Sequence, residues 1–397
     1  MPIFTLAIAE WLGTALWFTP NAVMEDLERA WSLGPGDIGW LTGAVQIGFL
    51  LGTLGIGLSG IADRVDASRL FALACVLGAT SNALLPYADA LGPAVGLRLM
   101  TGMSLAGIYP VGMKLMVGWA PEKAGLGLAW LIGMLVLGTA MPHLLAGLGH
   151  EETGWGGDWR LPLWIASILA LVAGAAVWRL GEAPIGKQSA KMTASRLAGL
   201  GAFRIAGFRL AAGGYFGHMW ELYTLWTLIP LLLATAIPGL SSTQLALWSF
   251  ALIAAGGPGC WLGGWLSLRY GSRNVAILGL AGSALCCGLF PWLAPQLSTT
   301  GYLLLLGTWS LLAVIDSPQF SALSANACPP TLIGSALTLQ NAIGFAISAV
   351  SIALLVPWLS TLGPTIAWTL LPGPLLGLWA LHRLARTLPR RDVALRE

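Results

Sequence analysis

Six ionisable residues lie well inside long apolar runs of this sequence, where such side chains are rare: Glu10, Arg98, His143, His218, Glu221 and Asp316. If these runs cross a lipid bilayer, a charge inside one costs at least about 2.5–3.5 kcal/mol, so the side chains should face a cavity or a partner. Carboxyl and imidazole groups also bind and release protons as their surroundings change. The chemistry indicated is the binding of a solute or a proton within the membrane.

His218 and Glu221 are three residues apart, which places them at neighbouring positions on one face of a helix. We expect the two side chains to share a proton, with Glu221 about 20 Å along its helix and so near the membrane middle. This pair predicts a site that couples protonation to transport. The alternative is a neutral Glu221 bonded to His218 that only holds this helix against its neighbours.

Asp316 and Gln319 flank a proline at position 318, and a proline inside a helix frees a backbone carbonyl and disturbs the preceding turn. These polar groups predict either a solute or proton site or a structural kink with a satisfied carboxyl group. Tyr109 and Pro110 form a similar kink earlier in the chain. We expect Arg98 to anchor carbonyls and acids around it, and to become a solute ligand only if the solute is an anion.

The elements that carry these residues are membrane helices. Hydrophobic residues make up 56% of the 397 positions and charged residues 9%, and the mean hydropathy is +0.77. A spanning helix needs about 20 apolar residues. The runs predict an all-α integral membrane protein with twelve transmembrane helices, and no cleavable signal peptide precedes the first. The spans expected are 3–23, 39–60, 70–88, 91–113, 125–148, 160–180, 208–234, 245–267, 274–293, 302–323, 332–356 and 364–386.

The orientation follows from Lys and Arg, which collect on the cytoplasmic side of a membrane. With the N-terminus inside, only Arg29 and Arg160 fall in external loops, which are otherwise acidic. We therefore expect both termini in the cytoplasm and a location in the cell inner membrane. The formal charge of +3 then reflects topology and not nucleic-acid binding. The expected cytoplasmic residues are Arg64, Arg69, Lys114, Lys123, Arg179, Lys187, Lys191, Arg196, Arg204, Arg209, Arg269, Arg273, Arg383, Arg386, Arg390, Arg391 and Arg396.

The five cysteines all fall in or at the ends of apolar runs, without the spacing of a metal site or an external disulfide. We interpret them as packing residues. No metal and no cofactor is expected.

The chain divides into two similar halves. A shared offset of about 205 to 209 positions relates Trp17 to Trp226, Arg64 to Arg269, Pro110 to Pro318, Pro121 to Pro330 and Gly125 to Gly334. This offset predicts a duplicated six-helix unit. We expect an N-terminal bundle over 1–182, a basic cytoplasmic linker over 183–206, a C-terminal bundle over 207–388 and a cytoplasmic tail over 389–397.

Two loops carry related motifs, Gly60-Ile61-Ala62-Asp63-Arg64 and Gly264-Trp265-Leu266-Ser267-Leu268-Arg269-Tyr270-Gly271. They resemble the cytoplasmic Gly-x-Leu-Ala-Asp-Arg-x-Gly-Arg signature of the major facilitator superfamily, and Arg98 to Gly102 resembles its Arg-x-x-x-Gly element. The loop Ala120 to Gly125 is similar to the family's loop before helix 5. Both signature copies are degenerate: the first has Ser59 and Asp66 at its glycine positions, and the second has Leu268 in place of Asp.

This resemblance implies two pseudo-symmetric six-helix bundles that rock about a central cavity, with monomers as the usual form. By the same resemblance, Asp63, Arg64 and Arg269 of this chain would form a conformational latch. Helices 1 and 7 line the cavity, which makes Trp17 and Trp226 candidates for its walls beside Glu10 and Glu221. The alternative for the tryptophans is packing or lipid contact.

The implied function is secondary transport of a small organic solute, coupled to protons. A dedicated oxyanion carrier is disfavoured because Arg98 is the only deep basic residue besides histidine. A drug–proton antiporter is an alternative, although Gly133 to Gly138 and Pro142 match the antiporter element only loosely. No convergent catalytic set indicates an enzyme. A non-transporting receptor or scaffold on the same fold stays open.

Overall fold

The computed structural model describes residues 2–34, 37–88, 90–149, 157–184, 199–329 and 332–386. Within these ranges the chain is helical and contains no strand. Three acidic residues of the expected external loops, Asp89, Glu151 and Glu152, lie outside these ranges. So do several residues named above: Lys187, Lys191, Arg196, Pro330, Arg390, Arg391 and Arg396. The side chains of Asp63 and Lys123 also lie outside the description.

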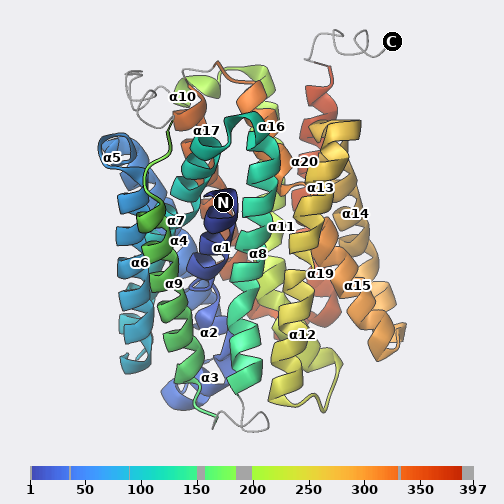
Figure 1. Ribbon diagram of the computed structural model, residues 1–397. Coiled ribbons are helices and arrows are strands. Elements are labelled where there is room, and N and C mark those ends of the chain that lie inside the picture. The colour runs from blue at the N-terminus through green and yellow to red at the C-terminus, as the bar shows by residue number, and fades with distance from the viewer. Residues whose placement is uncertain are drawn as a thin grey trace.

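Long helices make up most of the described chain and run side by side (Figure 1). They are α1 Pro2–Thr14, α4 Asp37–Ser59, α6 Ala67–Leu84, α7 Leu91–Trp119, α8 Ala124–Gly149, α9 Arg160–Leu180, α11 Ala206–Ala236, α12 Ser242–Ala254, α13 Gly256–Tyr270, α14 Ser272–Leu293, α15 Thr299–Leu312, α16 Ser317–Asn326, α17 Ile333–Leu355 and α20 Pro372–Leu384. Short helices connect them: α2 Thr19–Ala22, α3 Met24–Trp31, α5 Ile61–Arg64, α10 Gly199–Ala202, α18 Leu359–Leu362 and α19 Ile366–Leu370.

Ten segments of the described chain are long and apolar enough to cross a membrane. Helix α1 has only 13 residues and is not among them, and 333–384 counts as one segment of 52 residues. At about 1.5 Å per residue, a helix of that length would be more than twice as long as the hydrocarbon core is thick. The chain is therefore a multi-pass membrane protein.

The prediction of one unbroken span over 3–23 is wrong. Helix α1 ends at Thr14, a turn follows, and α2 begins at Thr19. Pro20 has no N–H, so it cannot donate to the carbonyl of Leu16 four residues earlier. The guanidinium group of Arg98 supplies that bond instead, with Nη1 3.0 Å from Leu16 O. A proline and a buried arginine together account for the break.

A second break separates α15 from α16 at residues 313–316, directly before Pro318. A proline contributes here too, because Pro318 cannot donate to the carbonyl of Val314, which accepts from Ser317 N at 3.0 Å instead. The expected kink at Tyr109 and Pro110 takes a different form, since α7 continues through Pro110 without interruption. The C-terminal half thus has a looser backbone at this point than the N-terminal half.

Glycines let several helices cross at very short distances. A Cβ atom at Gly102 of α7 would lie 2.1 Å from Val45 O of α4, and one at Gly48 would lie 2.1 Å from Leu99 O. Helices α11 and α20 meet in the same way, since a Cβ at Gly217 would lie 2.2 Å from Gly373 O. Close backbone approach at small residues is a general way to pack helices in lipid.

Replacing Gly102 by Val is therefore expected to push α4 and α7 apart and to lower the free energy of unfolding by about 2–3 kcal/mol. Gly96 offers a matched control on the same helix, because a Cβ there would meet nothing within 4 Å. Thermal unfolding of the two detergent-purified variants checks this. Equal melting temperatures for Gly102→Val and Gly96→Val would show that the crossing does not depend on glycine.

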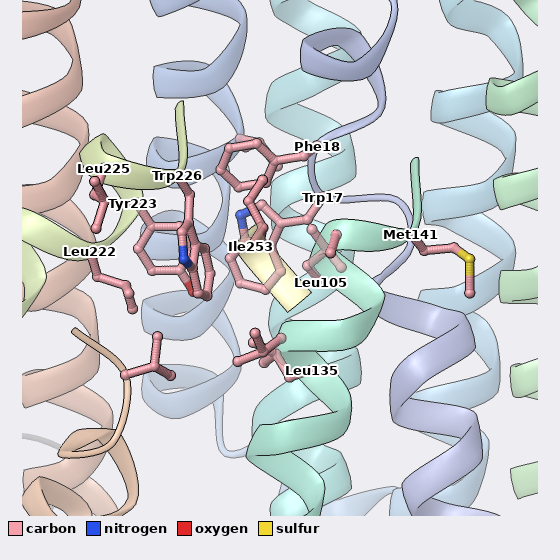
Figure 2. Close-up of a cluster of buried hydrophobic side chains, with 14 of the residues drawn as sticks. Trp17, Phe18, Leu105, Leu135, Met141, Leu222, Tyr223, Leu225, Trp226 and Ile253 are labelled. Carbon is pink, nitrogen blue, oxygen red and sulfur yellow. The ribbon is translucent and has the colours of Figure 1, made fainter. Parts of the chain in front are cut away.

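Two contacts join the helices of the first half to those of the second. Helix α4 packs along α17, with Gly39 beside Ile352 and Gly57 beside Thr338, and α8 packs along α12 and α13. Between these contacts lies an aromatic cluster of Trp17, Phe18, Phe49, Tyr223, Trp226 and Phe345, whose exposed fractions do not exceed 3%. Figure 2 shows Trp17 and Phe18, which follow α1, meeting Tyr223 and Trp226 of α11.

Candidate solute and proton site

A small cavity of about 40 Å³ lies between the two sets of helices, beside the aromatic cluster. Helices α7, α8, α11, α16 and α17 contribute its walls, along with Val314 from the break before α16. Its polar lining includes Tyr109, Tyr215, His218, Ser317 and Asn341, and Trp226 and Phe345 border it. No Lys, Arg, Asp or Glu lines it among the described residues. The cavity is thus polar and aromatic, with one imidazole group.

That imidazole group is paired with a buried carboxylate. His218 Nδ1 lies 2.9 Å from Asp316 Oδ1, although the ring N–H is not aligned with this oxygen as a hydrogen bond. The other ring nitrogen, Nε2, is 2.8 Å from the hydroxyl of Ser317. His218 and Asp316 are 2% and 1% exposed. The break before Pro318 places Asp316 behind His218, so the histidine lies between the carboxylate and the cavity.

The predicted pairing of His218 with Glu221 is wrong. Positions three apart on a helix differ by about 60° in direction, and the two side chains leave α11 toward different neighbours. His218 points to the start of α16, and Glu221 packs against α14 and α15. Its Oε1 atom accepts hydrogen bonds from Ser283, from Cys287 Sγ at 3.3 Å and from Trp309 Nε1 at 2.6 Å. These three contacts tie α11 to α14 and α15.

Glu221→Leu is expected to lower the free energy of unfolding by about 3 kcal/mol, because three buried donors lose their acceptor and each such loss costs about 1–3 kcal/mol. Glu221→Gln should cost much less, since its amide oxygen can still accept. Thermal unfolding of both variants measures the difference, with transport as a second assay. Loss of pH-driven uptake in a stable Glu221→Gln variant would instead return Glu221 to the proton site.

Arg98 is completely buried on α7, and its contacts are with the broken first span. Besides Leu16 O, it donates to the carbonyl of Trp17, and Nη1 is 3.3 Å from Thr19 Oγ1. Arg98 does not line the cavity. These contacts favour the anchoring role over solute binding.

Glu10 and Gln319 lie apart from the cavity lining. Glu10 is fully buried on α1 beside Gly112 of α7, and neither carboxyl oxygen has a hydrogen-bond partner among the described residues. Gln319 is 2% exposed on α16. The structure therefore brings His218 and Asp316 together at the cavity, with Trp226 in its wall, and leaves Glu10 as a separate buried carboxyl group.

The predicted latch residues lie at one end of the helices. Arg64 ends the short helix α5 and is exposed. Arg269 lies in the last turn of α13, with its guanidinium carbon 5.6 Å from the centre of the Tyr270 ring. The side chain of Asp63 lies outside what the structure describes.

Sequence reasoning gave too little weight to Tyr109, Tyr215 and Asn341, which line the cavity. One signal was available for α11. Its lining residues are Tyr215, His218, Met219, Leu222, Tyr223 and Trp226, which recur every three or four positions as one helix face does. Ser317 could not be found in this way, because the break before α16 changes the direction of the chain.

Solved structures with the same architecture are membrane transporters. The chain aligns over 98% of its length with the xylose transporter XylE from E. coli in a partially occluded inward-open conformation, covering 98% of that chain with a TM-score of 0.74 and 13% identity. It also aligns over 98% of its length with a mutant of the nucleoside transporter NupG, covering all of that chain with a TM-score of 0.70 and 14% identity. At 13% and 14% identity, these similarities show the fold alone.

The sequence itself defines the family. The profile of the Major Facilitator Superfamily matches residues 6–353, and the chain belongs to this superfamily of transporters, which are not enzymes. The resemblance inferred from the loop motifs is thereby confirmed. Over 131 residues the chain is 25% identical to the niacin transporter NiaP of Acinetobacter baylyi. That match spans 30% of this chain and 29% of the length of NiaP.

Proposed function

We propose that this chain is a secondary active transporter that moves a small organic solute across the cell inner membrane together with protons. The observation that carries the proposal is the buried His218–Asp316 pair at the wall of the cavity. An imidazole group and a carboxyl group 2.9 Å apart can share a proton, and a movement of the helices that hold them changes how firmly that proton is held. Opening the cavity to one side of the membrane is such a change.

We propose an architecture of twelve spans in two six-helix bundles, 1–182 and 207–388, joined by the linker 183–206 and followed by the tail 389–397. The broken first span and the division of 333–384 into two crossings add two spans to the ten long segments. Both termini are cytoplasmic in this proposal. The arrangement in Figure 1 supports it, since α5 and α10 lie at one end and the acidic helix α3 lies at the other.

Alternating access supplies the transport step. In the proposed cycle the bundles rock about the cavity, the contacts of α4 with α17 and of α8 with α12 and α13 open at one end, and Asp63, Arg64 and Arg269 act as the cytoplasmic latch. Trp226 borders the path of the solute, Trp17 and Gln319 are candidates to line that path once the bundles move, and Glu10 is a second candidate proton site. The protein works as a monomer in the bilayer.

The names of the similar proteins suggest the size of the solute. Niacin, nucleosides and xylose are all small organic molecules. The cavity of about 40 Å³ is smaller than the usual range of about 300–1,000 Å³ for ligand sites, so the bundles must move apart to admit such a solute, as alternating access requires. A solute of this class fits the aromatic and polar lining.

Proteoliposomes containing the purified protein provide the test. Labelled nicotinate, uridine and xylose are offered with an inward proton gradient, and we expect at least one to accumulate and to leak out again when a protonophore is added. Uptake without any response to the gradient would contradict proton coupling. No flux of any of these solutes would favour the receptor or scaffold alternative.

A further inference from the structure

Three of the six tyrosines of the chain meet in the cavity. Tyr109 comes from α7, and Tyr215 and Tyr223 come from α11. Tyr215 and Tyr223 are 8% and 3% exposed. The two helices thus bring a cluster of phenol groups to one cavity between the halves of the protein.

None of the three hydroxyl groups makes a hydrogen bond to a described residue, and all three residues border the cavity, so the hydroxyl groups are available to whatever enters it. Tyr302, which lies elsewhere, shows the normal case, with its hydroxyl donating to Leu232 O at 3.2 Å. The indole N–H of Trp226, in the cavity wall, is also buried without an acceptor. Four polar groups around one cavity therefore lack partners. Three of them come from α11 and one comes from α7. Such groups are satisfied when a ligand enters.

The charge of the cavity restricts what that ligand is. Its described lining has no Lys, Arg, Asp or Glu, and His218 is already engaged with Asp316 and Ser317. A buried ion without a counter-ion is strongly unfavourable.

We propose that Tyr109, Tyr215 and Tyr223 form a recognition site for an uncharged solute with several carbonyl, amide or hydroxyl groups. This inference rests on the proposed transport function, because it names the class of solute that the same cavity takes. The solute is neutral when bound, and the charge that moves with it is the proton held at the His218–Asp316 pair.

Two series of probes that vary in charge test the solute class. Isothermal titration calorimetry on the detergent-purified protein at neutral pH compares nicotinamide with nicotinate and 1-methylnicotinamide, and uridine with uridine monophosphate. We expect the neutral member of at least one series to bind at least tenfold tighter than its charged relatives. Equal or tighter binding of a charged member, or no binding of either neutral probe, overturns the proposal.

Removing single hydroxyl groups tests the residues. We expect Tyr109→Phe, Tyr215→Phe and Tyr223→Phe each to weaken binding of the preferred neutral probe about tenfold. The ligand-free variants should melt at about the same temperature, since each hydroxyl borders the cavity and makes no hydrogen bond to a described residue. The control Tyr302→Phe should show the opposite pattern, with a lower melting temperature and unchanged affinity. Unchanged affinity in all three cavity variants refutes the tyrosine site.

These measurements separate the recognition site from proton coupling. If a neutral probe binds in this pattern but its uptake ignores the proton gradient, the proposed coupling fails and the recognition site stands. If a charged solute is instead taken up under a proton gradient, the coupling stands and the tyrosine proposal fails.

Discussion

Asp316→Asn is expected to reduce pH-driven uptake at least tenfold while leaving exchange of solute across the membrane within about twofold of the original chain. The amide has the shape of the carboxylate but cannot bind a proton, so the His218–Asp316 pair can no longer share one. Exchange of labelled for unlabelled solute needs no net proton movement. Exchange therefore reports whether the cavity still binds the solute and whether the two bundles still rock about it.

Uptake into proteoliposomes with and without an inward proton gradient, together with counterflow exchange, measures the two quantities. Asp158→Asn is a matched control, because this Asp is exposed near the start of α9 and pairs only with the backbone and side chain of Arg160. His218→Gln should reproduce the Asp316→Asn result. If Asp316→Asn kept its full response to the gradient, the pair would be excluded from coupling, and Glu10 would become the leading candidate.

Arg98→Met is expected to lower the free energy of unfolding by about 3–5 kcal/mol. The substitution keeps a long side chain but removes the donor to the carbonyl of Trp17 and leaves that of Leu16 with only the long bond from Thr19 Oγ1, at 3.4 Å. Each lost bond of this kind costs about 1–3 kcal/mol, more where a charged donor is lost. The stability of Arg98→Lys should lie between that of the original chain and that of Arg98→Met, because one ammonium group cannot reach both carbonyls with the geometry of a guanidinium fork.

Thermal unfolding in detergent measures this effect, with Arg179→Met as the control. Arg179 is exposed in the last turn of α9, so its replacement should leave the melting temperature nearly unchanged. A stable Arg98→Met protein that had lost affinity for an anionic solute would contradict the anchoring role and identify Arg98 as a ligand.

The positions of most helices could be predicted from the sequence. The run 160–180 coincides with α9, and the runs 39–60 and 125–148 end within two residues of α4 and α8. Lipid requires each crossing to be a continuous apolar stretch with its backbone bonds satisfied internally, so length and hydropathy locate it. The break at residues 15–18 could not be predicted from length and hydropathy. It depends on Arg98, more than 70 positions away, which makes the hydrogen bond to Leu16 O that Pro20 cannot make.

The candidate site was predicted only in part. The sequence alone determined which ionisable residues enter the membrane, because an apolar run makes each of them conspicuous, and it determined the family through the loop motifs. Only the tertiary structure decided their partners. His218 and Glu221 are neighbours along one helix, yet the first meets Asp316 and the second meets Ser283 and Trp309. Spacing along a helix sets the direction of a side chain, whereas the helix that packs there, and the break before Pro318, determine what it touches.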